Sequence, residues 1–303
     1  MRLPAISASQ YRRITLVALV AVCAIVVTGA AVRLTDSGLG CTDWPSCTAH
    51  HFVARASFHP QVEQLNRDFT GLISVAVAIA VLGAFARVPR RRDLIVWSLG
   101  LVAGLVGDIL LGGTVVLSNL WPPFVMAHFL LSAAIVWDAV VLHERAGHDD
   151  TPGTLTVSTT VRNLGRALVA IAALVLLTGT VVTGTGPHAG DQHVKRLPFQ
   201  LEDVARIHSV CVWAFLALTV VTLVTLARTG APRVVLRRAT ELCVLIVAQG
   251  ALGYTQYFLG VPPALVLLHV AGALAVWVLA LRFQLGLYAH PAEIHDARVP
   301  VAP

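Results

Sequence analysis

Charged residues are scarce in this chain. They make up 13% of its 303 residues, about half of the roughly 25% found in soluble domains. Hydrophobic residues account for 56%. A soluble protein of this composition would leave a large apolar surface in contact with water. The shortage of charge therefore argues against a soluble class and favours a membrane protein.

The apolar residues are gathered in eight runs of roughly the length that crosses a bilayer as a helix. The first run, residues 14–32, contains no charge and is too long for the core of a signal peptide. Some of the others carry an isolated charge such as Asp108 or Glu241, which a bundle interior or a helix end accommodates. These runs cover residues 69–86, 94–114, 122–142, 164–182, 204–227, 239–258 and 262–281. The sequence thus predicts an all-α membrane protein with about eight transmembrane helices and no sizeable soluble domain.

The net charge of +6 does not indicate binding to nucleic acid, because the basic residues cluster in short loops between the apolar runs. By the positive-inside rule these loops, and with them both termini, are expected on the cytoplasmic side of the cell membrane. A few basic residues in the outer loops weaken this bias without reversing it. The inner clusters are Arg87, Arg90, Arg91 and Arg92, then Arg228, Arg233, Arg237 and Arg238; the outer residues are Arg33, Arg55, Lys195 and Arg196.

The chain repeats itself after about 140–150 residues. The segment 28–32 (TGAAV) resembles 178–182 (TGTVV), and a Pro-Pro pair followed by a histidine and a tryptophan occurs at 122–137 and again at 262–277. Each half holds four predicted helices, so both halves point the same way, and the expected symmetry axis runs along the membrane normal. We expect a first half at residues 1–142, a cytoplasmic linker at 143–163, and a second half with a cytoplasmic tail at 164–303.

Four polar side chains lie near the outer ends of the even-numbered helices, at matching places in the two halves: Asn66, His128, His208 and His269. A metal-binding group inside a membrane span is costly and therefore suggests a function. Paired histidines on facing helices hold haem in helical bundles, so we predict His208 and His269 as axial haem ligands. His128 has Asn66 opposite it instead of a histidine. The alternative for each histidine is a hydrogen bond between helices.

Glu63 lies one turn before Asn66, and Ala205 occupies its place in the second half. It is either an acid that interacts with a helix N-terminus or a carboxylate placed to handle a proton. The halves are therefore chemically unequal, and we infer that one holds a permanent cofactor while the other carries out chemistry. Cys41 and Cys47 lie in the first outer loop. They form a disulfide, bind zinc or copper with nearby histidines, or remain free thiols.

Three motifs together resemble the haem A synthase family: TGAAVRLTDSGLGCTDWPSC (28–47), VEQLNR (62–67) and TGTVVTGTGPHAGD (178–191). The resemblance extends over about residues 14–283. It implies oxidation of the C8 methyl group of haem O to a formyl group, through successive hydroxylations and loss of water, to supply haem–copper oxidases. It also implies a haem B cofactor on His208 and His269, substrate haem O on His128, and Glu63 as the essential glutamate. The family's first-loop cysteine pair corresponds to Cys41 and Cys47.

The chain departs from the family pattern at two places. Many members have E-x-x-H-R where this chain has E-x-x-N-R, and the amide of Asn66 does not replace imidazole as an iron ligand. The substrate iron is then five-coordinate on His128 or weakly bound there. The segment 186–196 (GPHAGDQHVKR) also lacks the second cysteine pair of some members. By charge and depth, Arg33 and Arg67 are candidates to bind the propionates, and the haem O synthase that supplies the substrate is a candidate partner.

Two other classes share some of these features. A b-type electron-transfer cytochrome would use the same histidine pair, but it would need neither Glu63 nor an unequal first half. A transporter built from parallel repeats would usually have broken helices at mid-membrane. Here the Pro-Pro pairs lie at helix ends, which disfavours a transporter.

Overall fold

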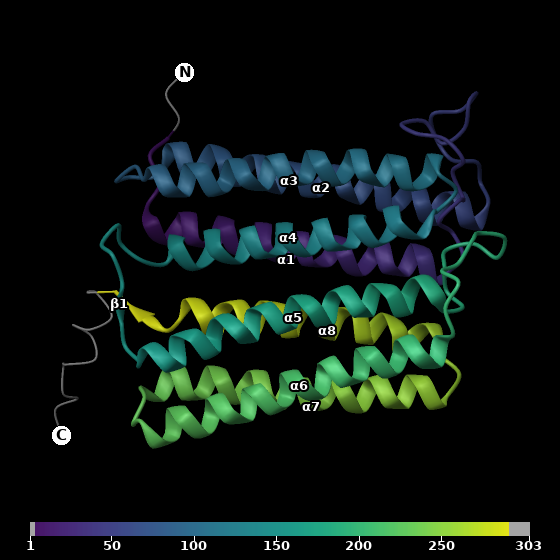
Figure 1. The fold of residues 1–303 in the computed structure, drawn as a ribbon. Helices are drawn as coiled ribbons and strands as arrows, with labels where there is room; N and C mark the ends of the chain where they lie inside the picture. Colours follow the sequence, from purple (N-terminus) through teal and green to yellow (C-terminus); the bar gives the residue numbers. More distant parts are fainter. Residues whose placement is uncertain (1–3, 291–303) are drawn as a thin grey trace.

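The computed structural model describes residues 4–290 of the chain. Eight long helices lie roughly side by side (Figure 1), and two short strands, β1 (Thr154–Leu155) and β2 (Tyr288–Ala289), pair antiparallel at one end. The prediction of an all-α protein with eight helices is confirmed. The tail predicted beyond the last helix lies mostly outside the described residues. The helices are α1 (Ala8–Leu34), α2 (Phe58–Ala86), α3 (Arg92–Leu117), α4 (Pro122–Ala146), α5 (Thr159–Thr185), α6 (Leu201–Arg228), α7 (Arg233–Phe258) and α8 (Pro263–Leu285).

Several helices extend past the apolar runs because polar residues cap their ends. Helix α1 begins at Ala8, where Ser7 and Gln10 form a reciprocal capping box. Helix α5 begins at Thr159, where the Ser158 hydroxyl accepts from the backbone N–H of Val161. The segment between α4 and α5 is therefore shorter than the predicted linker 143–163, since both neighbouring helices run into it.

The helices form two squares that share a seam. In the first half, contacts run around the square α1–α2–α3–α4, so α2 and α4 lie on a diagonal. The second half repeats this arrangement, and α6 and α8 lie on its diagonal. The halves meet through α1 and α4 on one side and α5 and α8 on the other (Figure 1). The predicted four-helix halves are thus present as two bundles of the same layout.

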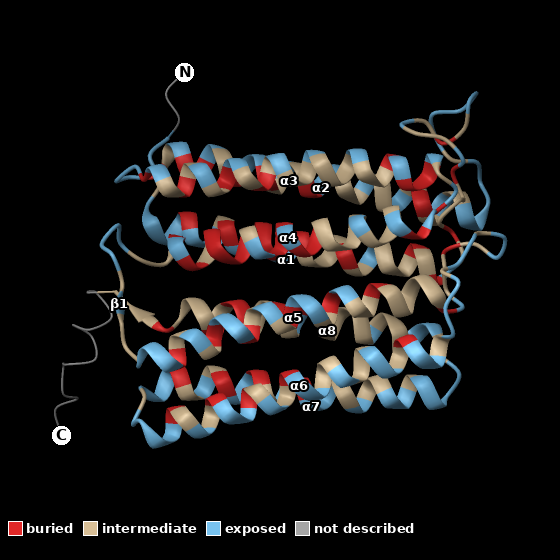
Figure 2. Cartoon of the chain, in the orientation of Figure 1, coloured by how far each residue is buried: buried red, intermediate tan, exposed pale blue. Residues whose placement is uncertain are grey.

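Many helix residues are exposed and are drawn pale blue in Figure 2, and large apolar residues are among them. Val17, Val96 and Val210 are each more than 60% exposed, which is favourable in lipid rather than in water. Seven helices are long and apolar enough to cross a membrane. Helix α7 is the exception, because Arg237, Arg238 and other polar residues lower its hydropathy. The protein is an all-α, multi-pass membrane protein.

The two ends of the bundle differ in packing. The described chain begins at one end, and the loop with Cys41 and Cys47 lies at the other (Figure 1), which we call the disulfide end. Buried residues of α7 stop at Ile246, and those of α8 begin at Leu274. The fully buried core of α7 and α8 therefore lies away from the disulfide end, and the turns nearer that end are half-buried or exposed.

Polar contacts reinforce the seam between the halves. The indole nitrogen of Trp277 on α8 donates to the Ala133 carbonyl on α4 at 2.9 Å. Further from the disulfide loop, Arg282 Nε donates to the buried Glu144 carboxylate at 2.7 Å. The apolar seam alone does not fix one register, and these two contacts help to do so.

Removing the indole hydrogen bond should weaken the seam. We expect Trp277→Phe to lower the free energy of unfolding by about 0.5–1.5 kcal/mol, the usual contribution of one intramolecular hydrogen bond. The measurement is unfolding in a denaturing detergent. The control is Trp137→Phe, at the corresponding place in the first half, where the side chain is 45% exposed. An equal loss in both variants would contradict the role given to the hydrogen bond.

Candidate functional site

The four polar residues predicted from the repeat lie on the diagonal helices of the two squares. Asn66 and His128 belong to α2 and α4, and His208 and His269 belong to α6 and α8. All four are half-buried and lie toward the disulfide end. Diagonal placement lets each pair face the interior of its bundle across the space between the other two helices.

His208 is held by a threonine of the neighbouring helix. Its Nδ1 atom lies 3.0 Å from the Thr178 hydroxyl, which itself donates to the Leu174 carbonyl of α5. The hydroxyl therefore accepts the Nδ1 proton of the imidazole, and Nε2 keeps its lone pair. Nε2 is the nitrogen left to bind a metal, in the manner of histidine ligands oriented by an outer partner.

His269 approaches the backbone of α7 closely. A Cβ atom on Gly253 would lie 3.1 Å from His269 Cε1, and one on Gly179 would lie 3.3 Å from His208 Cε1. Glycine at both places lets each imidazole lie flat against its neighbouring helix. The two imidazoles are also within electrostatic range of each other. The donor set and the loosely packed turns fit a flat ligand that is bound by two imidazoles.

The first half copies this arrangement with different groups. Thr28, the counterpart of Thr178, donates to the Asn66 carbonyl oxygen at 2.8 Å. Across the bundle, His128 Nδ1 lies 2.9 Å from Asp108 Oδ1 on α3, and Ser132 donates to the other carboxylate oxygen at 2.8 Å. One imidazole thus faces one amide, and the imidazole has a carboxylate beside it.

Asp108 was not singled out as a functional residue from the sequence, where it reads as an isolated charge within a span. Its position was nevertheless a usable signal. It precedes His128 by 20 residues, and a second polar residue, Gln249, precedes His269 by the same interval. The threonines of the repeated Thr-Gly motif were noticed as markers of the duplication, and the structure shows that they contact the site.

Glu63 is the centre of a second cluster. Its Oε2 accepts from the Cys41 backbone N–H at 2.7 Å, and its Oε1 accepts from Arg67 Nη2 at 2.6 Å. Arg67 lies one turn further along α2 and also donates to the Asp43 and Ser46 carbonyls. The buried carboxylate therefore ties the start of α2 to the first loop.

That loop is closed by a disulfide between Cys41 and Cys47, which confirms the disulfide alternative. The bond consumes the two thiols that a zinc or copper site would require. Within residues 4–290, no group of three or more metal-binding side chains is present. The loop also reaches α3, since a Cβ on Gly113 would lie 2.7 Å from the Trp44 ring. Trp44 thus packs over the end of α3.

The two arginines predicted to bind propionates lie in different surroundings. The guanidinium of Arg67 is engaged by Glu63 and by loop carbonyls, so it holds the loop in place. Arg33, at the end of α1, donates to the His188 carbonyl of the second-half loop at 2.7 Å. The structure therefore joins Arg67 to Glu63 and Cys41, and it places Arg33 at the seam.

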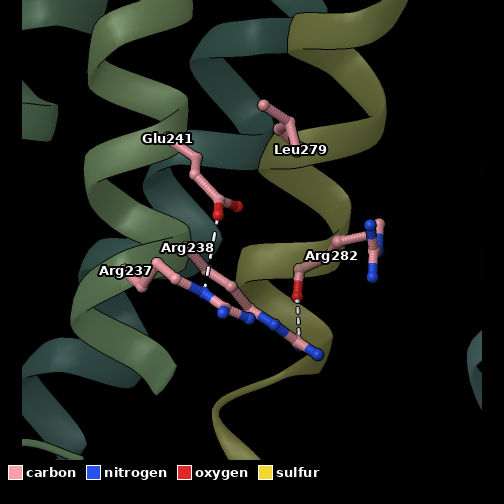
Figure 3. Close-up of a pocket in the computed structure, with 5 residues that line it drawn as sticks. All are labelled: Arg237, Arg238, Glu241, Leu279 and Arg282. Atoms are coloured by element: carbon pink, nitrogen blue, oxygen red, sulfur yellow. Dashed lines mark hydrogen bonds and ion pairs between the residues drawn. The ribbon is translucent and has the colours of Figure 1, made fainter. Parts of the chain in front are cut away.

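A pocket of about 200 Å³ at the opposite end does not belong to this site. Arg282 lies 13 residues beyond His269 on α8, or about 20 Å along the helix axis. Two of the lining arginines already have partners (Figure 3): Arg237 faces Glu241, and Arg238 donates to the Arg282 carbonyl. The pocket is lined by Arg237, Arg238, Glu241, Leu279 and Arg282.

Comparisons with known proteins find similar sequences over most of the chain. A family model described as a cytochrome oxidase assembly protein, COX15-CtaA, matches residues 12–63, which include most of α1, the disulfide loop and Glu63. A heme A synthase of Rhizobium rhizogenes is 26% identical, over 89% of this chain and 88% of its own. A heme A synthase of a Methylobacterium species is 28% identical, over 84% of this chain and 86% of its own.

The fold and the site define a multi-pass helical membrane protein of two four-helix halves, each with a polar pair on its diagonal helices. The similarities extend through both halves rather than through one motif. The chain is thus similar over most of its length to proteins named heme A synthase.

Loss of Arg67 should free the disulfide loop. In Arg67→Gln the loop carbonyls of Asp43 and Ser46 lose their donor, so we expect at least tenfold faster backbone hydrogen exchange over residues 41–47. The matched control is Arg206→Gln, since Arg206 pairs with Glu202 four residues earlier on α6 but is 70% exposed. Unchanged exchange in Arg67→Gln would show that the loop is held by other contacts.

Proposed function

We propose that this protein converts haem O to haem A, by oxidising the C8 methyl group to a formyl group, with a haem B bound between His208 and His269. The proposal is carried by one observation. The duplicated bundle has two imidazoles on the diagonal of one half, but an imidazole, an amide and a nearby helix-start carboxylate in the other half. Two identical sites would be expected if both halves bound the same ligand for the same purpose. Two different sites are expected if one half binds a permanent cofactor and the other binds the substrate.

In the second half, His208 and His269 would provide the two axial ligands. Thr178 orients His208 by accepting its Nδ1 proton, and Gly179 and Gly253 leave room for the two rings. When bound there, haem B supplies reversible one-electron storage. Thr178 and Gln249 would hold the two imidazoles in place. Among residues 4–290, no ion pair joins an acidic side chain to either imidazole.

In the first half, His128 would hold the iron of the substrate haem O. The Asn66 carbonyl oxygen already accepts from Thr28, so its amide forms a polar wall of the site rather than an iron ligand. A single strong ligand suits a substrate, which must leave after it has reacted. Arg33 remains a candidate for binding a propionate from the side of the seam.

Glu63 would accept a proton as the methyl group is oxidised. The Cys41 N–H and Arg67 both donate to its carboxylate, and these charge-assisted contacts stabilise the ionised form that a base requires. An electron-transfer cytochrome would have no use for a buried carboxylate held in this way. The Glu63 cluster therefore favours an enzyme over that alternative.

The first test replaces the proposed base. Glu63→Gln keeps an oxygen for the Cys41 N–H but cannot accept the proton, so haem A formation should fall at least 100-fold while haem B stays bound. Haem extraction and mass analysis of membranes supplied with haem O measure both quantities. Glu202→Gln, which changes a second-half acid with a side chain 62% exposed, is the control. Normal haem A formation in Glu63→Gln would remove Glu63 from the mechanism.

The second test concerns the resident cofactor. Leucine has no lone pair for iron, so His269→Leu should abolish the optical bands of the bound haem B in the purified protein. His193→Leu changes a loop histidine whose side chain is 93% exposed and should leave the bands intact. Retention of the wild-type spectrum in His269→Leu would refute the ligand assignment.

A further inference from the structure

The two histidines of α4 and α8 have different partners at Nδ1. His128 Nδ1 lies 2.9 Å from a carboxylate oxygen of Asp108. His269 Nδ1 lies 3.4 Å from the amide nitrogen of Gln249, which donates to the His269 carbonyl at 2.8 Å. Both partners precede their histidine by 20 residues, so the comparison is between equivalent places in the repeat.

A residue about one turn after each histidine contacts the polar residue that lies beside that histidine. Ser132, one turn after His128, donates to the second oxygen of Asp108. Gly272, one turn after His269, leaves room for the longer side chain, since a Cβ there would lie 2.2 Å from Gln249 Oε1. In each half, the helix that carries the histidine thus also accommodates the polar residue beside it, through a serine in one half and a glycine in the other.

Asp108 and His128 are in close contact inside the first half. Asp108 Oδ1 and His128 Nδ1 are buried atoms 2.9 Å apart, at ion-pair distance, and neither makes a hydrogen bond with any residue among 4–290. A contact that only joined α3 to α4 would be met by Ser132 and Asp108 alone. The orientation of the carboxylate toward the imidazole therefore needs a separate reason.

Carboxylates beside the outer nitrogen of a histidine ligand have a known chemical effect. They accept the Nδ1 proton, which leaves the Nε2 lone pair for the metal, and they make the imidazole a stronger electron donor. The Gln249 atom nearest His269 Nδ1 is its amide nitrogen, which is a donor and does neither. Stronger donation stabilises the oxidised iron and lowers its reduction potential.

We propose that Asp108 is a positioning residue that fixes the Nδ1–H form of His128 and lowers the reduction potential of the iron bound there, while Gln249 leaves the iron on His269 easier to reduce. This inference rests on the proposed function. The difference between the partners favours electron movement from the substrate half to the cofactor half. Two halves with the same helix layout would therefore hold irons of different reduction potential, and electrons would pass from the lower potential to the higher one.

The test is Asp108→Asn in the full-length protein, purified with its bound haems from cells supplied with haem O. Asparagine keeps the size of the side chain but removes the charge, so the midpoint potential of the first-half haem should rise by about 59 mV or more, a tenfold change for one electron. Affinity for haem O should fall about 10–100-fold. Spectroelectrochemical titration measures the midpoint potential, and optical titration measures the affinity for haem O. The first-half signal is the one absent from His128→Leu.

The matched control is Asp138→Asn. Asp138 is a second aspartate in a first-half helix, α4, but it faces Gly100 of α3 rather than an imidazole. Both measured values should therefore stay at the wild-type level. Asp108→Glu keeps the carboxylate and should retain the lower potential. Where Asp108→Asn does not fold, Ser132→Ala loosens the carboxylate and should give a smaller shift of the same sign.

Two results would overturn the inference. One is an unchanged first-half potential in Asp108→Asn, or in Ser132→Ala where Asp108→Asn does not fold. The other is an equal shift in Asp138→Asn. Failure of the proposed function is distinguishable, because it appears in the wild-type protein as an absence of haem A. A wild type that makes haem A, together with an unshifted Asp108→Asn, rejects only the role of Asp108.

Discussion

A polar group inside an apolar helix bundle must find its partner within the protein, because lipid offers none. This requirement organises the disulfide end of the molecule. Thr178 accepts from His208, and Glu63 gathers the Cys41 N–H and Arg67 around its carboxylate. The Thr178 contact joins two helices, and the Cys41 contact joins a helix to a loop. The partners that satisfy a buried group therefore also fix where its reactive atom points, and stability and chemistry depend on the same bonds.

Packing is divided along the helix axis in a way that serves the site. At the end of the bundle opposite the disulfide end, the interior of the second half is filled by buried residues such as Phe215 and Leu242. Nearer the disulfide end, the residues that face the two histidines on the neighbouring helices are glycines, Gly179 and Gly253. A core filled to native density along its whole length would leave no space for a flat ligand. The filled end stabilises the bundle, and the end with the glycines is where the proposed ligand would bind.

The fold followed from the sequence because its signals are long and repeated. Eight apolar runs and a duplicated Thr-Gly motif were sufficient to predict two four-helix halves. The polar pairs were predicted from the same repeat. The network around Glu63 was only partly predictable, because Arg67 at the i+4 position was visible but the Cys41 N–H was not. Asp108 was overlooked for a related reason: a lone charge in an apolar run does not show which neighbouring helix it faces.

Duplication supplies an internal comparison that a single bundle lacks. The two halves share helix order, diagonals and the threonine beside the first polar residue, so the backbone does not dictate where they differ. Yet the polar residue 20 positions before each histidine differs, and so do its surroundings: Ser132 donates to Asp108, whereas Gly272 leaves room for Gln249. Ser132 lies four residues after its histidine and Gly272 three residues after its own, so each half meets its polar residue from its own position on the helix. A difference of side chains on one shared backbone layout is what the proposed division between a cofactor half and a substrate half requires.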